Sequence, residues 1–446
     1  MYNLSGLCSN GADSNVLFPR FLKIIMTAAS SARVQINRER LLQRFLSYVQ
    51  VGTAANPASD EYPSSSGQWD LGKLLKKELQ ELTVEDACQD EHALVWGTVP
   101  ASNGGQGPTV ALVAHLDTSP EAPGDDVKPQ VIRSYSGGDI RLASGSIIDV
   151  ASCPALESMQ EMTLVTTDGT TLLGGDDKAG VAIIMEFVAT LVENPHLMHG
   201  PVKVLFTCDE EIGRGTDKID LEKLNATVAY TLDGGGAAVI DEETFSADAA
   251  IVHFVGHNIH PSIAKDRMVN AVRAAADFVA KLPRETCSPE TTDGREGFIH
   301  PYTIEGGVGE ATVELILRSF ESVDLKTYAE QLQAVADVVV RSQPGLKANV
   351  KIVRQYRNLR DGLGDLPEAV TLAKQAFDNL GIEYKSESIR GGTDGSQLTE
   401  KGLPTPNLSS GQHNIHAVTE FACLDEMAAA VEHLVELMSL WSQYRS

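Results

Sequence analysis

The sequence of 446 residues has few cysteines, no long apolar run and a shortage of positive charge. Its six cysteines are scattered without paired spacing, which argues against a disulfide framework or a cysteine-rich zinc site. Free thiols indicate a reducing compartment, and we expect the cytoplasm. No apolar stretch approaches the about 20 residues of a transmembrane helix. The net charge of −25 excludes nucleic acid and anionic membranes as favoured partners.

The length of the chain exceeds what one hydrophobic core supports, so we expect two domains. Residues 1–34 hold a short apolar segment interrupted by charge, which predicts a disordered or spurious leader. A targeting signal is the alternative, and Met26 could be the true start. Strands and helices then alternate through Gly236. This pattern predicts an α/β catalytic domain, residues 35–245 and 358–446, with a mixed, mostly parallel sheet and helices on both faces.

The pattern changes between these two catalytic segments. Alternating apolar residues predict strands at 249–255, 298–305, 311–320 and 348–355, and helical periodicity predicts helices at 269–282 and 323–342. This βαββαβ order is the ferredoxin-like arrangement. We therefore predict an inserted ferredoxin-like lid domain that spans residues 246–357.

Four clusters of acidic and histidine residues each follow an apolar segment: His115-Leu116-Asp117, Asp176-Asp177-Lys178, Asp209-Glu210-Glu211 and Asp233-Gly234-Gly235-Gly236. A single cluster of this kind more often marks a solvated loop. The carboxyl ends of strands in an open α/β sheet, however, form the crevice where ligands bind. Four clusters in register with strand ends therefore indicate one polar site. Imidazole and carboxylate groups suit a pair of zinc ions, and cobalt or manganese would also fit.

Spacing within the clusters suggests separate roles for neighbouring residues. The side chains of His115 and Asp117 lie on one face if the strand continues, because strand side chains alternate with period two. A carboxylate so placed can orient a metal-binding imidazole. Glu210 and Glu211 are adjacent and point in different directions, so that one can bind metal while the other acts as a base.

The four clusters resemble the metal motifs of the M20 metallopeptidases. The first motif covers residues 115–120, the second covers 166–180, and the third and fourth cover 209–213 and 231–236. The resemblance runs from about residue 38 to the C-terminus. Within the family, residues 63–69, 389–398 and 402–408 are similar to the branch of tripeptide aminopeptidases. An inserted lid domain and a homodimer formed through it are also implied.

This resemblance implies two Zn²⁺ ions per chain and assigns their ligands by position. One metal would be held by His115, Asp176 and Asp233. The other would be held by Asp176, Glu211 and His416, so that Asp176 bridges the two. The family often has a cis peptide bond at the position of Asp176-Asp177.

Two further catalytic roles are implied by position. Glu210 matches the general base, and Asp117 matches the residue that orients His115. His416 departs from the family pattern in its flanking residues, Ile415 and Ala417. His413 therefore competes with His416 as a ligand, although His416 keeps the spacing to the residues that follow.

Substrate-binding residues are also implied. His260 matches a lid histidine that stabilises the tetrahedral oxyanion, and its alternative is a turn histidine before proline. Arg318 and Arg390 match arginines that contact a short peptide, although Arg318 could be a solvated strand residue. We expect a dinuclear zinc aminopeptidase that releases the N-terminal residue from tripeptides. The alternatives are another M20 activity, dipeptidase or aminoacylase, or a catalytically inactive binding protein.

Overall fold

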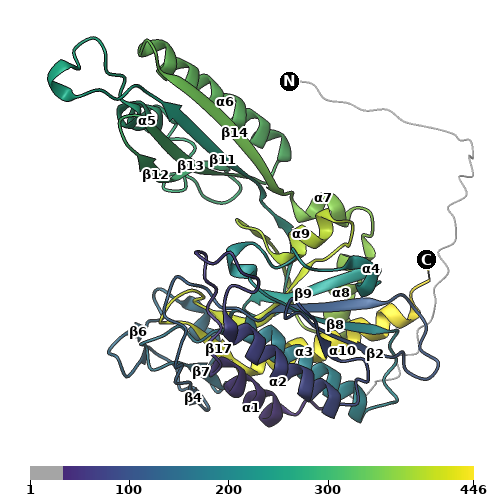
Figure 1. Cartoon of the computed structure of the whole chain (residues 1–446). Coiled ribbons are helices and arrows are strands. Elements are labelled where there is room, and N and C mark those ends of the chain that lie inside the picture. Colours follow the sequence, from purple (N-terminus) through teal and green to yellow (C-terminus); the bar gives the residue numbers. More distant parts are fainter. Residues whose placement is uncertain (1–33, 446) are drawn as a thin grey trace, which may run out of the picture. The chain divides into compact units, whose positions relative to one another are not determined.

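The computed structural model describes residues 34–445, and the predicted leader lies outside the described residues except for Val34. The largest of the three sheets in this range has eleven strands. Several of its strands are labelled in Figure 1. Four parallel neighbours form its centre: β8 (Val202–Thr207), β3 (Val110–His115), β9 (Val228–Gly235) and β16 (Asn407–His413). All six residues of β3 are buried, as expected of a strand that is covered on both faces.

Antiparallel strands extend this parallel centre on both sides. On the β8 side lie β2 (Val95–Val99) and β1 (Cys88–Gln89). On the β16 side lie β17 (Phe421–Cys423), β7 (Leu164–Thr166) and β4 (Gln130–Ile132). A branch joins β10 (Val239–Thr244) to β16, and β15 (Lys385–Ile389) to β10. The predicted mixed α/β class is confirmed.

Helices cover the sheet on two sides. On one side, α3 (Gly175–Glu193) and α10 (Leu424–Gln443) pack on each other and on central strands, with α1 (Arg38–Val49) against both and α8 (Glu368–Leu380) against α10. Figure 1 shows α4 (Leu221–Leu224) and α9 (Asp394–Glu400) on the other side of the strands. Nearly every residue of α3 is buried, so this helix lies inside the fold rather than on its surface. Two more helices complete this part, α2 (Ser66–Glu81) and α7 (Leu359–Leu363).

A second sheet has its own hydrophobic core. Its chain order is β11 (Ser246–Val255), α5 (Ala271–Ala280), β12 (Phe298–Gly306), β13 (Glu310–Ser319), α6 (Ser322–Ser342) and β14 (Lys347–Tyr356). The strands pair antiparallel in the spatial order β12-β13-β11-β14, which is the ferredoxin-like order. Burial alternates along β13, so one face of the sheet is packed and the other is more open.

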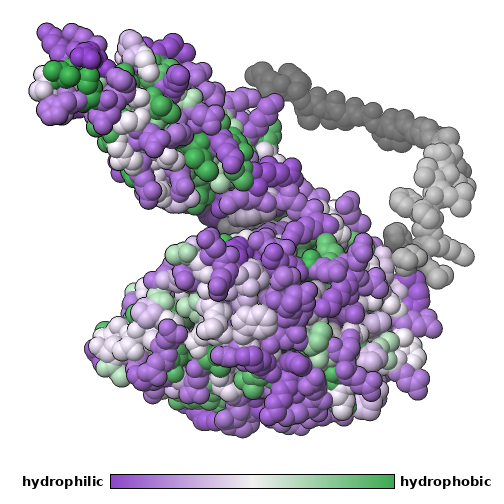
Figure 2. Space-filling model, in the orientation of Figure 1, coloured by the Kyte–Doolittle hydropathy of each residue, from purple (hydrophilic) through white to green (hydrophobic). Residues whose placement is uncertain are grey.

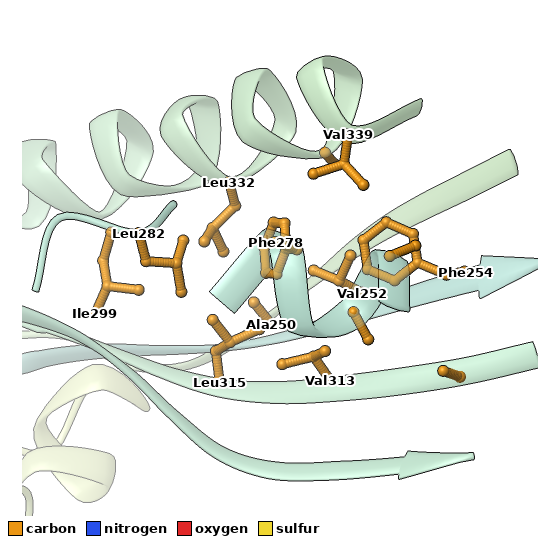
Figure 3. Close-up of a cluster of buried hydrophobic side chains, with 14 of the residues drawn as sticks. Ala250, Val252, Phe254, Phe278, Leu282, Ile299, Val313, Leu315, Leu332 and Val339 are labelled. Atoms are coloured by element: carbon orange, nitrogen blue, oxygen red, sulfur yellow. The ribbon is translucent and has the colours of Figure 1, made fainter. Parts of the chain in front are cut away.

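The packed face lies under α5 and α6. Figure 3 shows Phe278 of α5 and Leu332 of α6 pointing toward Val252, Phe254 and other strand residues. The predicted division of the chain at 246 and 357 stays a prediction, and it is supported by the positions of β11 and β14 at the two ends of this unit.

Some apolar side chains of this second unit are exposed, among them Tyr302 and Ile304 of the edge strand β12, which are 52% and 53% exposed. Figure 2 shows hydrophobic residues gathered on the visible face of this unit. The predicted homodimer through the lid stays a prediction.

One segment differs from the predicted helix–strand alternation. Residues 116–174, all within the described part, contain short strands and a 3₁₀ turn, Pro154–Ser158, but no α-helix. Glycine, proline, serine and aspartate are frequent here, and these residues favour turns over regular structure. The segment returns to the sheet through β7 and leads into α3, which begins at the second acidic cluster.

Two further properties of the described residues concern membrane-spanning helices and cysteine pairing. Among residues 34–445, no helix combines the length and apolar character that crossing a bilayer requires. The five cysteines of this range are unpaired.

Candidate metal centre

Three parallel strands bring the acidic clusters to one edge of the sheet. β3 lies between β8 and β9, so their carboxyl ends share that edge. His115 is the last residue of β3, Asp209 follows β8, and Asp233 lies near the end of β9. Asp209 has a φ of +62°, a left-handed conformation that turns the chain sharply after β8. The sharp turn places Glu210 and Glu211 over the strand ends.

Asp176 lies between two histidines at the start of α3. Its Oδ1 is 2.9 Å from Nε2 of His115, and its Oδ2 is 3.3 Å from Nε2 of His416. Asp233 Oδ1 lies 3.7 Å from the same His115 nitrogen, and Glu211 Oε2 lies 3.0 Å from the His416 nitrogen. Asp176 has non-helical dihedral angles, and the Asp176–Asp177 peptide bond is cis. The five ligands predicted from the sequence therefore lie together, with one carboxylate facing both imidazoles.

Asp177 is a further candidate that the sequence did not single out as a ligand. Two groups of ligand atoms lie within 4.8 Å of one another: His115, Asp177 and Asp233 in one, and His115, Asp176 and Glu211 in the other. The carboxylate of Asp177, however, accepts hydrogen bonds from the backbone N–H groups of His115 and Gly180, both at 3.1 Å. These bonds engage both of its oxygens, so Asp176 is the better ligand.

The two candidate histidines of the 407–423 hairpin lie in different places. His416 has a φ of +62° and reaches Asp176 and Glu211. His413 instead lies 2.7 Å from Glu426 through Nε2 and stacks on the ring of Phe421. The geometry therefore favours His416 as the ligand.

Asp117 contacts both the first histidine and the third cluster. Its Oδ1 lies 3.4 Å from Nδ1 of His115. Its two carboxylate oxygens also accept hydrogen bonds from the backbone N–H groups of Glu210 and Glu211, both at 3.1 Å. The side chain of Glu210 makes no hydrogen bond or ion pair within the described residues and lines a cavity. It is therefore free to meet a ligand.

The site holds more buried negative charge than its own cations balance. Among residues 34–445, no lysine or arginine nitrogen lies within 4 Å of the carboxylates of Asp176, Glu211 or Asp233. Burial, with the charge of Asp176, raises the pKa of Glu211 to about 7 and that of Asp233 to about 8. Burial also raises the pKa of Glu210 well above its usual range. Buried carboxyls of this kind need protons or bound cations.

The pKa values of the two histidines depend on the same negative charge. Burial alone would lower the pKa of His115, but the carboxylates of Asp117, Asp176 and Asp233 raise it well above its usual range. Hydrogen bonds to Asp176 and Glu211 raise the pKa of His416 to about 11. The Oε1 atom of Glu211 is buried and has no hydrogen-bond partner. An unpaired buried carboxylate oxygen among imidazoles and acids fits a divalent cation better than it fits any group of the chain.

A cavity of about 1250 Å³ opens beside these residues. Its lining includes Glu210, Asp176, Asp233 and, from β13 of the second sheet, Arg318. Arg318 is the only lysine or arginine among the described lining residues. Its guanidinium donates to Oε1 of Gln355 and to the carbonyl of Leu317, both at 3.1 Å, and lies over the ring of Tyr356. Within the described residues it forms no ion pair with a carboxylate. The cavity is thus lined by candidate metal-ligand residues and by an arginine without a carboxylate partner.

The other two predicted substrate residues lie outside this lining. Arg390 donates to the carbonyl oxygens of Gly294 and Thr292 at 2.9 and 3.3 Å. His260 is exposed, and its Nδ1 lies 2.7 Å from Oγ of Ser262. The substrate roles of both stay predictions.

Sequence reasoning missed the residues that hold the Asp209 turn. Oγ of Ser64 donates to Asp209 at 2.5 Å, and Nε2 of Gln68 donates to it at 2.7 Å. Gln68 Oε1 in turn accepts the N–H of Asp209 at 3.0 Å. Both residues belong to the segment 63–69, which the sequence used only to place the chain in a branch of the family. The available signal was their polar character at and just before the start of α2.

Comparisons with known proteins agree with this geometry. Residues 167–440 match the model of peptidase family M20/M25/M40. Peptidase T of Geobacillus thermodenitrificans strain NG80-2 is 41% identical over 411 residues, which cover 92% of this chain and 100% of that protein. The chain therefore belongs to this peptidase family.

Two solved structures share the fold. The aminopeptidase PepT of Bacillus cereus ATCC 10987 is 24% identical with a TM-score of 0.70, and the match covers 92% of this chain and 100% of that one. The Bacillus subtilis protein YxeP, described as a dinuclear metal-binding peptidase of the M20 family, is 15% identical with a TM-score of 0.61. That match covers 90% of this chain and 98% of that one.

Proposed function

We propose that this member of the M20/M25/M40 family is a tripeptide aminopeptidase that binds two Zn²⁺ ions. The observation that carries the proposal is the position of Asp176, whose two oxygens lie 2.9 and 3.3 Å from the imidazoles of His115 and His416. A carboxylate so placed suits a bridge between two metals, which lie about 3.5–4 Å apart in such sites. Peptidase T of Geobacillus, to which the chain is similar along nearly its whole length, supports the substrate class.

Five residues would hold the metals. His115, Asp176 and Asp233 would bind one ion, and Asp176, Glu211 and His416 would bind the other. Their mixture of imidazole and carboxylate suits zinc, with cobalt or manganese as alternatives. When bound, the ions would polarise the scissile carbonyl and lower the pKa of a coordinated water.

The chain's own residues would carry the proton. We assign Glu210 as the general base, because its carboxylate lines the cavity and is not engaged by the chain. Glu210 would take a proton from the attacking water and deliver it to the leaving amine. Burial raises the pKa of Glu210, and a higher pKa makes a carboxylate a stronger proton acceptor. Asp117 would hold the ring of His115 and the backbone of Glu210 in place.

The far end of the substrate would meet Arg318. A tripeptide presents a carboxylate two residues beyond its N-terminal residue, and an arginine without an acidic partner is suited to bind it. The cavity is larger than the about 300–1,000 Å³ of most small-molecule sites, so it has room for such a peptide. His260 and Arg390 would join the substrate only after a movement of their segments.

Peptide length provides the test. Metal-loaded protein should release alanine from tri-alanine faster than from di- or tetra-alanine, with products identified by mass spectrometry. Amidation of the tri-alanine C-terminus should raise KM about tenfold or more, since a hydrogen bond to a charged group contributes about 1.5–3 kcal/mol. Arg318→Ala should cause the same loss and make the enzyme insensitive to amidation.

Arg273→Ala, which removes an exposed arginine of α5, is the matched control and should leave KM unchanged. Equal rates on free and amidated peptides by the unmodified chain would contradict recognition of the carboxylate. Preference for dipeptides or N-acyl amino acids would favour a dipeptidase or an aminoacylase instead.

A further inference from the structure

Glu420 is a buried acid that the catalytic proposal does not use. Its side chain is 1% exposed. One oxygen accepts hydrogen bonds from the backbone N–H groups of Leu173 and Gly174, at 2.7 and 2.8 Å. The other accepts from the backbone N–H of Asp176 at 3.0 Å. Within the described residues, the hydrogen bonds of this carboxylate therefore all go to one short segment of backbone.

That segment carries the residue on which the metal centre depends. Leu173 and Gly174 precede α3, and Gly174 has a φ of +79°. The carbonyl of Gly174 accepts the N–H of Lys178, but the N–H groups of Leu173 and Gly174 donate to the Glu420 carboxylate and not to a strand or helix carbonyl. Asp176 must nevertheless present one oxygen to each of two histidines. Sites of this kind tolerate displacements of only about 0.5 Å. The bonds to Glu420 restrain N–H groups of this segment that no strand or helix bond engages.

Glu420 also belongs to the loop that carries His416. It lies four residues after that histidine, and its N–H donates to the carbonyl of Ala417 at 3.0 Å. The next residue, Phe421, begins β17, which is paired on one side with β16 and on the other with β7. One end of Glu420 is thus anchored in the sheet beside His416, while its carboxylate reaches the segment of Asp176.

We propose that Glu420 is a positioning residue that fixes Asp176 relative to His416 at the separation that metal binding needs. The inference rests on the dinuclear site proposed above. A simpler role, stabilisation of the fold near the start of α3, is also served by a buried acid at a helix N-terminus. The two roles differ in one measurable respect. Only the positioning role predicts that a folded, metal-free Glu420 variant binds metal more weakly than the unmodified chain does.

Glu420→Gln is the sharpest variant, because it preserves size and removes one acceptor. Its oxygen can keep the bonds to Leu173 and Gly174, but its amide nitrogen cannot accept the N–H of Asp176. We expect zinc affinity to fall about 10- to 100-fold, the usual effect of losing a residue that orients a metal ligand. Affinity is measured by competition with a chromophoric chelator on full-length, metal-free protein whose circular dichroism spectrum matches that of the unmodified chain.

Glu426→Gln is the matched control. Glu426 lies in the same part of the chain and its carboxylate contacts His413 rather than the Asp176 segment. This variant should bind zinc as the unmodified chain does. Excess zinc should restore much of the tripeptide hydrolysis of Glu420→Gln with KM unchanged, because the base and the cavity are intact. If Glu420→Gln fails to fold, Glu420→Asp keeps the charge on a shorter stem and should show the same loss of affinity.

The outcomes separate this inference from the proposed function. Zinc affinity equal to that of the unmodified chain in a folded Glu420 variant would overturn the positioning role. An equal loss in Glu426→Gln would overturn it as well. An unmodified chain that binds no zinc would instead overturn the dinuclear site itself.

Discussion

Replacement of Glu210 by glutamine is expected to lower kcat by about two orders of magnitude or more, the usual effect of removing an acid–base catalyst. The reason is that glutamine cannot take a proton from water, while its size and its backbone bond to Asp117 stay the same. Metal content should not change, because the carboxylate of Glu210 is not among the oxygens that face the histidines. Steady-state kinetics on tri-alanine, together with metal analysis of the same sample, measures both.

Glu222→Gln is the control for this experiment. It makes the same chemical change at an exposed position of α4, and it should leave kcat as it is. Near-normal turnover by Glu210→Gln would refute the assignment of the base. Loss of metal along with activity would show that Glu210 is a ligand.

Replacement of Asp176 by alanine is expected to remove both metals and to lower activity more than about 100-fold. The expectation follows from the two oxygens of Asp176, each of which faces a different histidine. Loss of a direct ligand should exceed the about 10- to 100-fold effect of a residue that only orients one. Glu211→Ala should be milder in metal content, because in the proposed site Glu211 would hold only the ion beside His416. Metal content per chain, measured after dialysis, distinguishes the two variants.

Asp168→Ala is the matched control for this experiment. Asp168 lies eight residues earlier in the same motif, and its carboxylate accepts hydrogen bonds from Thr170. This variant should keep both metals. If Asp176→Ala retained one tightly bound metal with full occupancy, Asp176 would not be the bridge, and Asp177 would become the candidate to examine.

The fold was most predictable where the pattern of apolar residues was regular. The alternation of 311–320 and the helical period of 323–342 predicted β13 and α6 to within a residue at each end. Residues 116–174 resisted prediction, since their short strands are stabilised by partners far along the chain. β4, for example, pairs with β7, and β7 pairs with β17. Strands of two or three residues are too short to show a periodicity in the sequence.

The clusters at residues 115–117, 209–211 and 233–236 were predictable as one polar site, because they lie at the ends of parallel strands that share one edge. The choice of Asp176 and His416 as ligands came from the family resemblance.

The residues that hold these side chains in place were not predictable. Glu420 and Gln68 act on backbone groups of Asp176 and Asp209, which lie 244 and 141 residues away in the sequence. The carboxylate of Glu420 bonds only to backbone N–H groups within the described residues, so no complementary side chain marks its partner in the sequence. Arg390 shows the opposite case. Its motif predicted a contact with substrate, and in the structure it donates to the carbonyl oxygens of Thr292 and Gly294.

Zinc titration of the metal-free chain tests the central claim most directly. The protein is stripped with a chelator and dialysed, and zinc is added stepwise while release of alanine from tri-alanine is followed. Two bound ions per chain are expected, because His115 and His416 lie on opposite oxygens of Asp176. The account predicts no activity in the metal-free chain and full activity when about two equivalents are bound. Full activity without metal, or saturation at a single equivalent, would contradict it.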